Sequence, residues 1–247
     1  MLPAIEGIIA RRILLNFRAD PAVVRRVVPE PLGLDLASGH AVVGVCLIRL
    51  ERVRPRGLPE IIGLSSENMA HRFAIVAKRD GIDTPGVYIS RRDTDSAFVR
   101  ILGGRVFPGY HHGANFEVDD NGDRLSMTIR TEDGAADVRL SARASGEWPQ
   151  SQLFPRLADA SKFFERGACG YSCGRDGHTL EGLELRTLAW KVSPLAIDTV
   201  HAAYFERSTR FPPGSVTFDH ALIMRGIAHE WHGLQHVPEL AADFVAG

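Results

Sequence analysis

Two adjacent histidines, His111 and His112, are the side chains of this sequence best suited to proton chemistry. They stand in the run Gly-Tyr-His-His-Gly-Ala at positions 109–114, a few residues after Arg105. The unperturbed pKa of histidine is about 6.5, so an imidazole can act as an acid, a base or a metal ligand near neutral pH. The segment therefore predicts a site at which protons are exchanged beside an arginine.

The same run resembles the active-site segment of acetoacetate decarboxylases, in which a Gly-Arg pair precedes Gly-aromatic-Pro-Lys-Lys-x-Ala. Here the run is one residue shorter, and His111 and His112 stand where the lysine pair is expected. In those enzymes a neutral lysine amine attacks a ketone, and the resulting iminium ion accepts the electrons of the departing carboxylate. Imidazole cannot form that imine. The resemblance therefore implies a shared fold with changed chemistry.

Other segments resemble a bacterial family, domain of unknown function 2071, which is grouped with acetoacetate decarboxylase by fold. They are Arg-Ile-Leu-Leu-Asn-Phe at 12–17, Val-Pro-Glu-Pro-Leu at 28–32, Gly-His-Ala-Val-Val-Gly-Val at 39–45, Ser-Ser-Glu-Asn at 65–68, Gly-Val-Tyr-Ile-Ser at 86–90 and Phe-Asp-His-Ala-Leu at 218–222. The resemblance implies a mainly β (α+β) fold over one domain, residues 1–247. It would be a closed or nearly closed β-barrel with a few short peripheral helices and an internal small-molecule pocket.

Local patterns independently predict many strands and few helices. Apolar runs and alternation predict strands over 11–19, 39–49, 67–78, 86–90, 115–118, 124–131, 136–144, 183–204 and 216–227. Capping residues and helical spacing predict helices over 22–28, 93–102 and 155–166, and residues 167–177 read as a glycine-rich loop. Hairpin turns are expected at 119–123 and 132–134.

The resemblance also indicates which side chains line the pocket. Glu67 precedes the histidine pair much as the decarboxylases place a pocket carboxylate before their lysines, so we expect Glu67, His111 and His112 to supply catalytic groups. Arg72, Arg105 and Tyr110 are the expected ligand-binding residues, since a guanidinium group suits a carboxylate. Neighbouring residues of a strand project to opposite faces, so at most one of the two histidines enters the pocket. Structural roles stay open for each: a salt bridge for Glu67, a hydrogen-bonded histidine, and a loop anchor for Arg105.

Three functions remain open at this point. The first is an enzyme that acts on a small carbonyl, enol or keto-acid compound by carboxylate and histidine acid–base chemistry, without a Schiff-base lysine. The second is a non-catalytic protein that binds a small apolar or acidic metabolite. The third is imine chemistry from another strand, with Lys78 or Lys191 as the amine; Lys162 is the remaining lysine of the sequence.

Charge and hydrophobicity limit the classes of partner that this protein is expected to bind. A formal net charge of -1 argues against nucleic acid, whose binding needs clustered positive charge. No stretch approaches the roughly 18 apolar residues of a membrane span, and no basic leader precedes an apolar segment. We therefore expect a cytoplasmic protein with a small-molecule ligand and no membrane or nucleic-acid partner. A homo-oligomer stays open, since nothing in the sequence marks an interface.

Neither a metal nor a cofactor is expected. Cys169 and Cys173 with His178 do not have a zinc-site spacing, and Cys46 makes the number of cysteines odd. A second histidine cluster at 229–236 lacks the His-Glu-x-x-His pattern, and we expect a solvated C-terminal loop there. His220, beside an aspartate, is expected to be structural.

Overall fold

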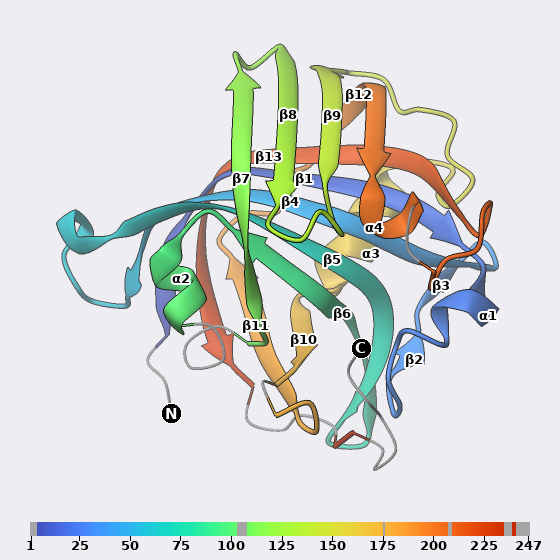
Figure 1. Ribbon diagram of the computed structural model, residues 1–247, viewed down its shortest axis with the longest axis horizontal. Helices are drawn as coiled ribbons and strands as arrows, with labels where there is room; N and C mark the ends of the chain where they lie inside the picture. The colour runs from blue at the N-terminus through green and yellow to red at the C-terminus, as the bar shows by residue number, and fades with distance from the viewer. Residues whose placement is uncertain (1–3, 103–107, 175, 207–208, 235–238, 241–247) are drawn as a thin grey trace.

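Strands dominate the computed structural model, which describes residues 4–102, 108–174, 176–206, 209–234 and 239–240 (Figure 1). The strands in these ranges are β1 (Ile5–Ala19), β2 (Gly33–Leu34), β3 (Leu36–Ala37), β4 (His40–Pro55), β5 (Leu64–Arg79), β6 (Ile82–Thr94), β7 (His111–Asp120), β8 (Arg124–Thr131), β9 (Val138–Ala144), β10 (Cys169–Cys173), β11 (Leu180–Thr187), β12 (Ser193–Ala202) and β13 (Val216–Gly233). The helices are α1 (Pro21–Val24), α2 (Ala97–Leu102), α3 (Leu157–Arg166), α4 (Ala203–Glu206) and the 3-10 turn η1 (Glu60–Ile62). The predicted mainly β fold with a few short helices is confirmed.

The strands pair into one sheet that closes on itself in two rings. One ring runs from β13 through β1, β4, β5, β6, β10 and β11 and returns to β13. The other leaves β6 through β7, β8, β9 and β12 and also returns to β13. Both rings share β13, β1, β4, β5 and β6, so the sheet is ring-like without being one clean barrel.

The five shared strands form a wall with a protein core on each face, which explains their long apolar runs. On β1, Ile13 and Leu15 belong to the larger core, which the strands β7 to β9 and β12 cover from the other side. Leu14, between them in the chain, packs on the opposite face with Phe164 of α3. A strand alternates its side chains between faces, so this wall sends successive residues into two different interiors.

Residues close together in the sequence determine the start of α1 and two of the hairpin turns. Asp20 caps α1 by accepting a hydrogen bond from Ala22 N at 2.8 Å, and Pro21 occupies the first helical turn. The hairpins after β7 and β8 contain Gly122 and Gly134 with φ of 92° and 67°, a region that glycine adopts without a steric penalty. Both predicted hairpins are confirmed.

Two predicted loops were wrong because each finds a strand partner far away in the sequence. The glycine-rich stretch 167–177 contains β10, which pairs in parallel with β6 and antiparallel with β11. In the C-terminal cluster, His229 and His232 lie within β13, where they pair with β1 and β11, while residues 235–236 of the predicted loop lie outside the described residues. A local pattern cannot reveal such pairings, because the partner strand supplies the hydrogen bonds. Within the described ranges, no helix has the length and apolarity needed to cross a bilayer.

Candidate ligand-binding cavity

A cavity of about 160 Å³ opens on the α3 side of the shared wall. Three arginines line it, Arg12 from β1, Arg72 from β5 and Arg92 from β6. The remaining walls are mostly apolar and aromatic, and they include Cys46, Ile48, Ala70, Val87, Ile89, Phe164, Leu183, Leu185, Trp190 and Trp231. A concave, largely apolar site with a few convergent polar groups is the usual form of a small-molecule site.

Arg72 reaches the cavity across a neighbouring strand that has no side chain at that point. Asn16 on β1, Gly44 on β4 and Arg72 lie side by side in the sheet, and Arg72 Nη2 donates to Asn16 Oδ1. A Cβ at Gly44 would lie 3.2 Å from Arg72 Nη2, so the glycine provides the space that the guanidinium group occupies. The ring of Phe164 stacks on the guanidinium group, with Cζ 4.9 Å from the ring centroid. Burial lowers the pKa of Arg72 to about 10.

Arg92 and Arg12 reach the cavity from two other strands of the wall, β6 and β1. Arg92 Nη2 donates to Ser172 Oγ at 3.2 Å, and burial lowers the pKa of Arg92 to about 10 as well. Arg12 Nε donates to Cys46 Sγ at 3.3 Å. The Nε atoms of Arg72 and Arg92 are buried and lack a hydrogen-bond partner among the described residues.

These three cations face the cavity without a carboxylate bound to any of them in the ranges that the structure describes. Glu165 of α3 lines the cavity but is exposed, and Glu181 interacts with Arg92 electrostatically while accepting a hydrogen bond from Gly109 N. Desolvating a cation costs free energy unless an anion or dipoles compensate for the lost water. The arrangement therefore favours a bound anion.

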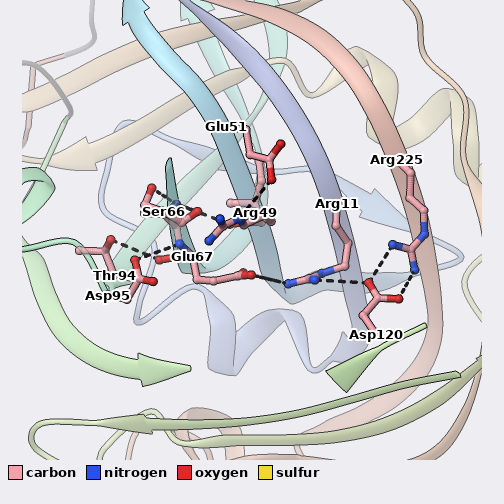
Figure 2. A network of polar contacts seen from close by, with 11 residues as sticks. Arg11, Arg49, Glu51, Ser66, Glu67, Thr94, Asp95, Asp120 and Arg225 are labelled. Atoms are coloured by element: carbon pink, nitrogen blue, oxygen red, sulfur yellow. Dashed lines mark hydrogen bonds and ion pairs between the residues drawn. The ribbon is translucent and has the colours of Figure 1, made fainter. Parts of the chain in front are cut away.

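Glu67 lies on the opposite face of the wall, within an ionic network (Figure 2). Its two carboxylate oxygens accept from Arg11 Nη2 at 2.8 and 2.9 Å. Arg11 Nη1 also donates to Asp120 at 3.3 Å, and Arg225 donates to the same Asp120 at 2.8 Å through each of its two Nη atoms. Burial raises the pKa of Glu67, and the Arg11 cation opposes that shift. The network ties β5, β1, β7 and β13 together.

The side chains of His111 and His112, the two histidines of the sequence motif, project to opposite faces of the sheet. His111 is buried and pairs with Arg92 of β6, whose side chain lines the cavity. His112 pairs with Asp93 in the sheet. Burial lowers the pKa of His112, and the nearby Arg91 cation lowers it further. Cavity-lining Ala70 and Arg72 alternate along β5 with Glu67, Met69 and His71, so Glu67 and His111 belong to different faces.

The other predicted ligand-binding residues have different environments. Tyr110 is 56% exposed, and its ring lies 4.7 Å from that of His112. Arg105 lies outside the described residues. Of the predicted set, Arg72 is the residue that lines the cavity.

Sequence reasoning missed Arg12, Arg92 and Cys46, although a signal for the arginines was present. Arg11-Arg12 and Arg91-Arg92 are adjacent pairs inside strands, just as His111-His112 is. An adjacent pair in a strand with two buried faces must send one cation to each face. Arg11 and Arg91 find carboxylates, Glu67 and Asp93 respectively, whereas Arg12 and Arg92 face the cavity.

The lysines that imine chemistry would need lie elsewhere. Lys78, Lys162 and Lys191 are all exposed, and none of them is among the side chains that line the cavity. The described residues also contain no cluster of three or more histidine, cysteine or acidic side chains arranged to hold a metal.

Solved structures that align with this chain include acetoacetate decarboxylases and an acetoacetate decarboxylase-like enzyme. The acetoacetate decarboxylase of Legionella pneumophila aligns with a TM-score of 0.62 and 13% identity over 98% of this chain and 88% of that chain. An acetoacetate decarboxylase-like enzyme of Sphingomonas wittichii aligns with a TM-score of 0.58 and 14% identity over 96% and 95%. The enduracididine biosynthesis enzyme MppR, complexed with the condensation product of pyruvate and imidazole 4-carboxaldehyde, gives a TM-score of 0.55 and 13% identity over 94% and 89%.

The chain therefore shares the fold of these acetoacetate decarboxylase-like proteins. Residues 9–223 match DUF2071, described as an uncharacterized conserved protein, and the chain belongs to this family. No curated protein matches the sequence.

Proposed function

We propose that this protein binds a small oxo acid in the cavity beside α3, with the carboxylate held by Arg12, Arg72 and Arg92. The proposal rests on these three guanidinium groups. They line a mostly apolar cavity, and none of them is bound to a carboxylate among the described residues. Guanidinium groups bind carboxylates through paired, charge-assisted hydrogen bonds. The rest of the ligand would contact the aromatic walls, including Trp190 and Trp231.

The fold relatives support an oxo acid as the ligand class. Their names and complexes include acetoacetate decarboxylase and a form of MppR bound to pyruvate, so this fold accommodates small oxo acids in other proteins. The exposed positions of Lys78, Lys162 and Lys191 argue against an imine with the bound acid. We therefore propose binding without Schiff-base chemistry.

Titration calorimetry with pyruvate, acetoacetate and phenylpyruvate, each beside its methyl ester, tests the proposal. We expect the acids to bind and the uncharged esters to bind at least about 10-fold more weakly, since a hydrogen bond to a charged group contributes about 1.5–3 kcal/mol. Arg92→Gln should weaken acid binding by about 10- to 100-fold on the same grounds. The matched control is Arg130→Gln, because Arg130 is exposed and pairs with Glu117 at the surface. Equal affinity for acid and ester, or equal effects of the two variants, would contradict the proposal.

A second candidate is an enzyme that moves a proton on the bound acid. His111 is not among the residues that line the cavity, but its strand pairing with cavity-lining Arg92 favours this candidate. In this version His111 is the acid–base group, while Glu67 stabilises the fold through Arg11 and His112 lies on the other face. Deuterium exchange at the carbon next to the carbonyl group, followed by NMR, measures such a step. We expect His111→Gln to abolish protein-catalysed exchange while the acid still binds, with the exposed His201→Gln as control. Exchange that survives His111→Gln would remove this candidate.

A further inference from the structure

Cys46 of β4 faces the cavity and takes no part in the binding proposed above. Its neighbours in the sheet are Leu14 on β1 and Ala70 on β5, and Ala70 in turn pairs with Arg92. The small side chain of Ala70 leaves the thiol next to the cavity, where Cys46 is one of the lining residues. The thiol is therefore buried from bulk solvent, at 7% exposure, but adjacent to the ligand space.

The arginines converge on this thiol from three strands. Arg12 Nε donates a hydrogen bond to Cys46 Sγ at 3.3 Å, and both Arg72 and Arg92 interact with Cys46 electrostatically. The Nε atom of Arg72, a residue only 3% exposed, has no partner among the described residues and lies in the same cavity wall. Together these groups would hold an anion within reach of the sulfur.

The other two cysteines have different surroundings. Cys169 accepts a hydrogen bond from Arg79 Nη1 at 3.3 Å, and Cys173 lies 3.3 Å from the hydroxyl of Tyr88. Neither lines the cavity, and burial raises the pKa of both thiols. Of the three cysteines, all of which lie in the described ranges, Cys46 is the one that lines this cavity beside arginine side chains.

We propose that Cys46 is a covalent site for the bound oxo acid, at which the thiol adds reversibly to the carbonyl carbon. A bond forms between Sγ and that carbon, the π bond of the carbonyl group breaks, and the thiol proton is transferred to the former carbonyl oxygen. The product is a hemithioketal, and no atom is oxidised or reduced. This inference rests on the proposed binding of an oxo acid. Cys46 would then be the nucleophile in a cavity that has no lysine in its lining.

Alkylation of the unmodified protein tests the site without any ligand or variant. Iodoacetate is an anion and iodoacetamide is neutral, and both transfer a carbon to sulfur with loss of iodide. Electrostatic focusing in a charged cleft raises local reagent concentration and rate by about 10-fold or more. We expect the rate ratio of iodoacetate to iodoacetamide at Cys46 to exceed that at Cys173 by about 10-fold, read by peptide mass spectrometry. Equal ratios at the two cysteines, or a Cys46 that reacts with neither reagent, would overturn the proposal.

Pyruvate labelled with ¹³C at its carbonyl carbon tests the addition itself. We expect a protein-bound tetrahedral carbon signal with the unmodified chain and its loss in Cys46→Ser and Cys46→Ala, the second variant guarding against a folding defect in the first. Free hydrate gives a signal in all samples and serves as the reference. If the acid binds by calorimetry but no Cys46-dependent signal appears, the covalent site is refuted while the proposed function stands. If neither binding nor the signal is seen, both fail.

Discussion

Replacing Gly44 with alanine tests how the wall positions Arg72. The added Cβ would lie 2.3 Å from the carbonyl oxygen of Leu15 and 3.2 Å from Arg72 Nη2. Real Cβ atoms essentially never approach another heavy atom closer than 3.0 Å, so the contact with the β1 backbone is about 0.7 Å too short. Because the partner is backbone, β1 and β4 would have to separate, and Arg72 would have to leave Asn16.

Overpacking of this kind costs about 1–3 kcal/mol of the free energy of unfolding. For a chain of this length, each kcal/mol lowers the melting temperature by about 2–4 °C. Displacing Arg72 should also weaken oxo-acid binding by about 10-fold, the lower value for one charged hydrogen bond. Urea denaturation and calorimetric titration measure the two effects separately.

Gly146→Ala is the matched control, because a Cβ there meets no atom within 4 Å and the residue is not among those with positive φ. We expect this variant to change stability by no more than about 0.5 kcal/mol, as for most surface substitutions. If Gly44→Ala matched Gly146→Ala in both assays, the absence of a side chain at Gly44 would not be what sets the position of Arg72 and the spacing of β1 and β4.

Three further outcomes are expected. Glu67→Gln should lower the free energy of unfolding by about 3 kcal/mol, because it removes the nearer of the two carboxylates that pair with buried Arg11. Glu117→Gln, at an exposed ion pair, should change the free energy of unfolding by less than about 1 kcal/mol. Equal effects of the two variants would contradict a stabilising role for the buried network. Burial lowers the pKa of His71 to about 3, so the folded state binds fewer protons than the unfolded state below pH 6.5, and stability should fall by up to about 1.4 kcal/mol per pH unit between pH 6.5 and pH 3. His71→Phe, which keeps an aromatic ring against Tyr204, should flatten that part of the pH profile in urea denaturation, and an unchanged slope would count against the assignment. Borohydride with acetoacetate should give no adduct on any of the three lysines by intact mass, beside an acetoacetate decarboxylase that is trapped under the same conditions; an adduct would restore imine chemistry.

Several local features and the family resemblance could be predicted from the amino-acid sequence. Apolar runs, the Asp20-Pro21 cap and the glycines at 122 and 134 predicted strands, a helix start and two hairpins, because these depend on neighbouring residues alone. The resemblance of residues 109–114 to the decarboxylase segment, with His111 and His112 where a lysine pair is expected, could also be seen in the sequence, since it concerns residue type and not position in space.

Which member of each adjacent pair faces the cavity could be assigned from the folded chain but not from the sequence. Arg11 and Arg12, like Arg91 and Arg92, look equivalent in sequence, yet a strand with two buried interiors sends one to each side. The assignment depends on register, and with a period of two, a shift by one residue exchanges the faces. Irregularities between Ile9 and Arg11 in the pairing of β1 with β4 show how easily such a shift arises.

The cavity likewise depends on pairings that close the rings. β10 and β11 complete the ring on the α3 side through β6 and β13, although their own residues suggested a glycine-rich loop and a strand without a known neighbour. Hydrogen bonds between strands more than 80 residues apart have no signature in either segment. For that reason the sequence predicted an internal pocket without identifying its walls. The arginines and the thiol that line the cavity could be identified only in the folded chain.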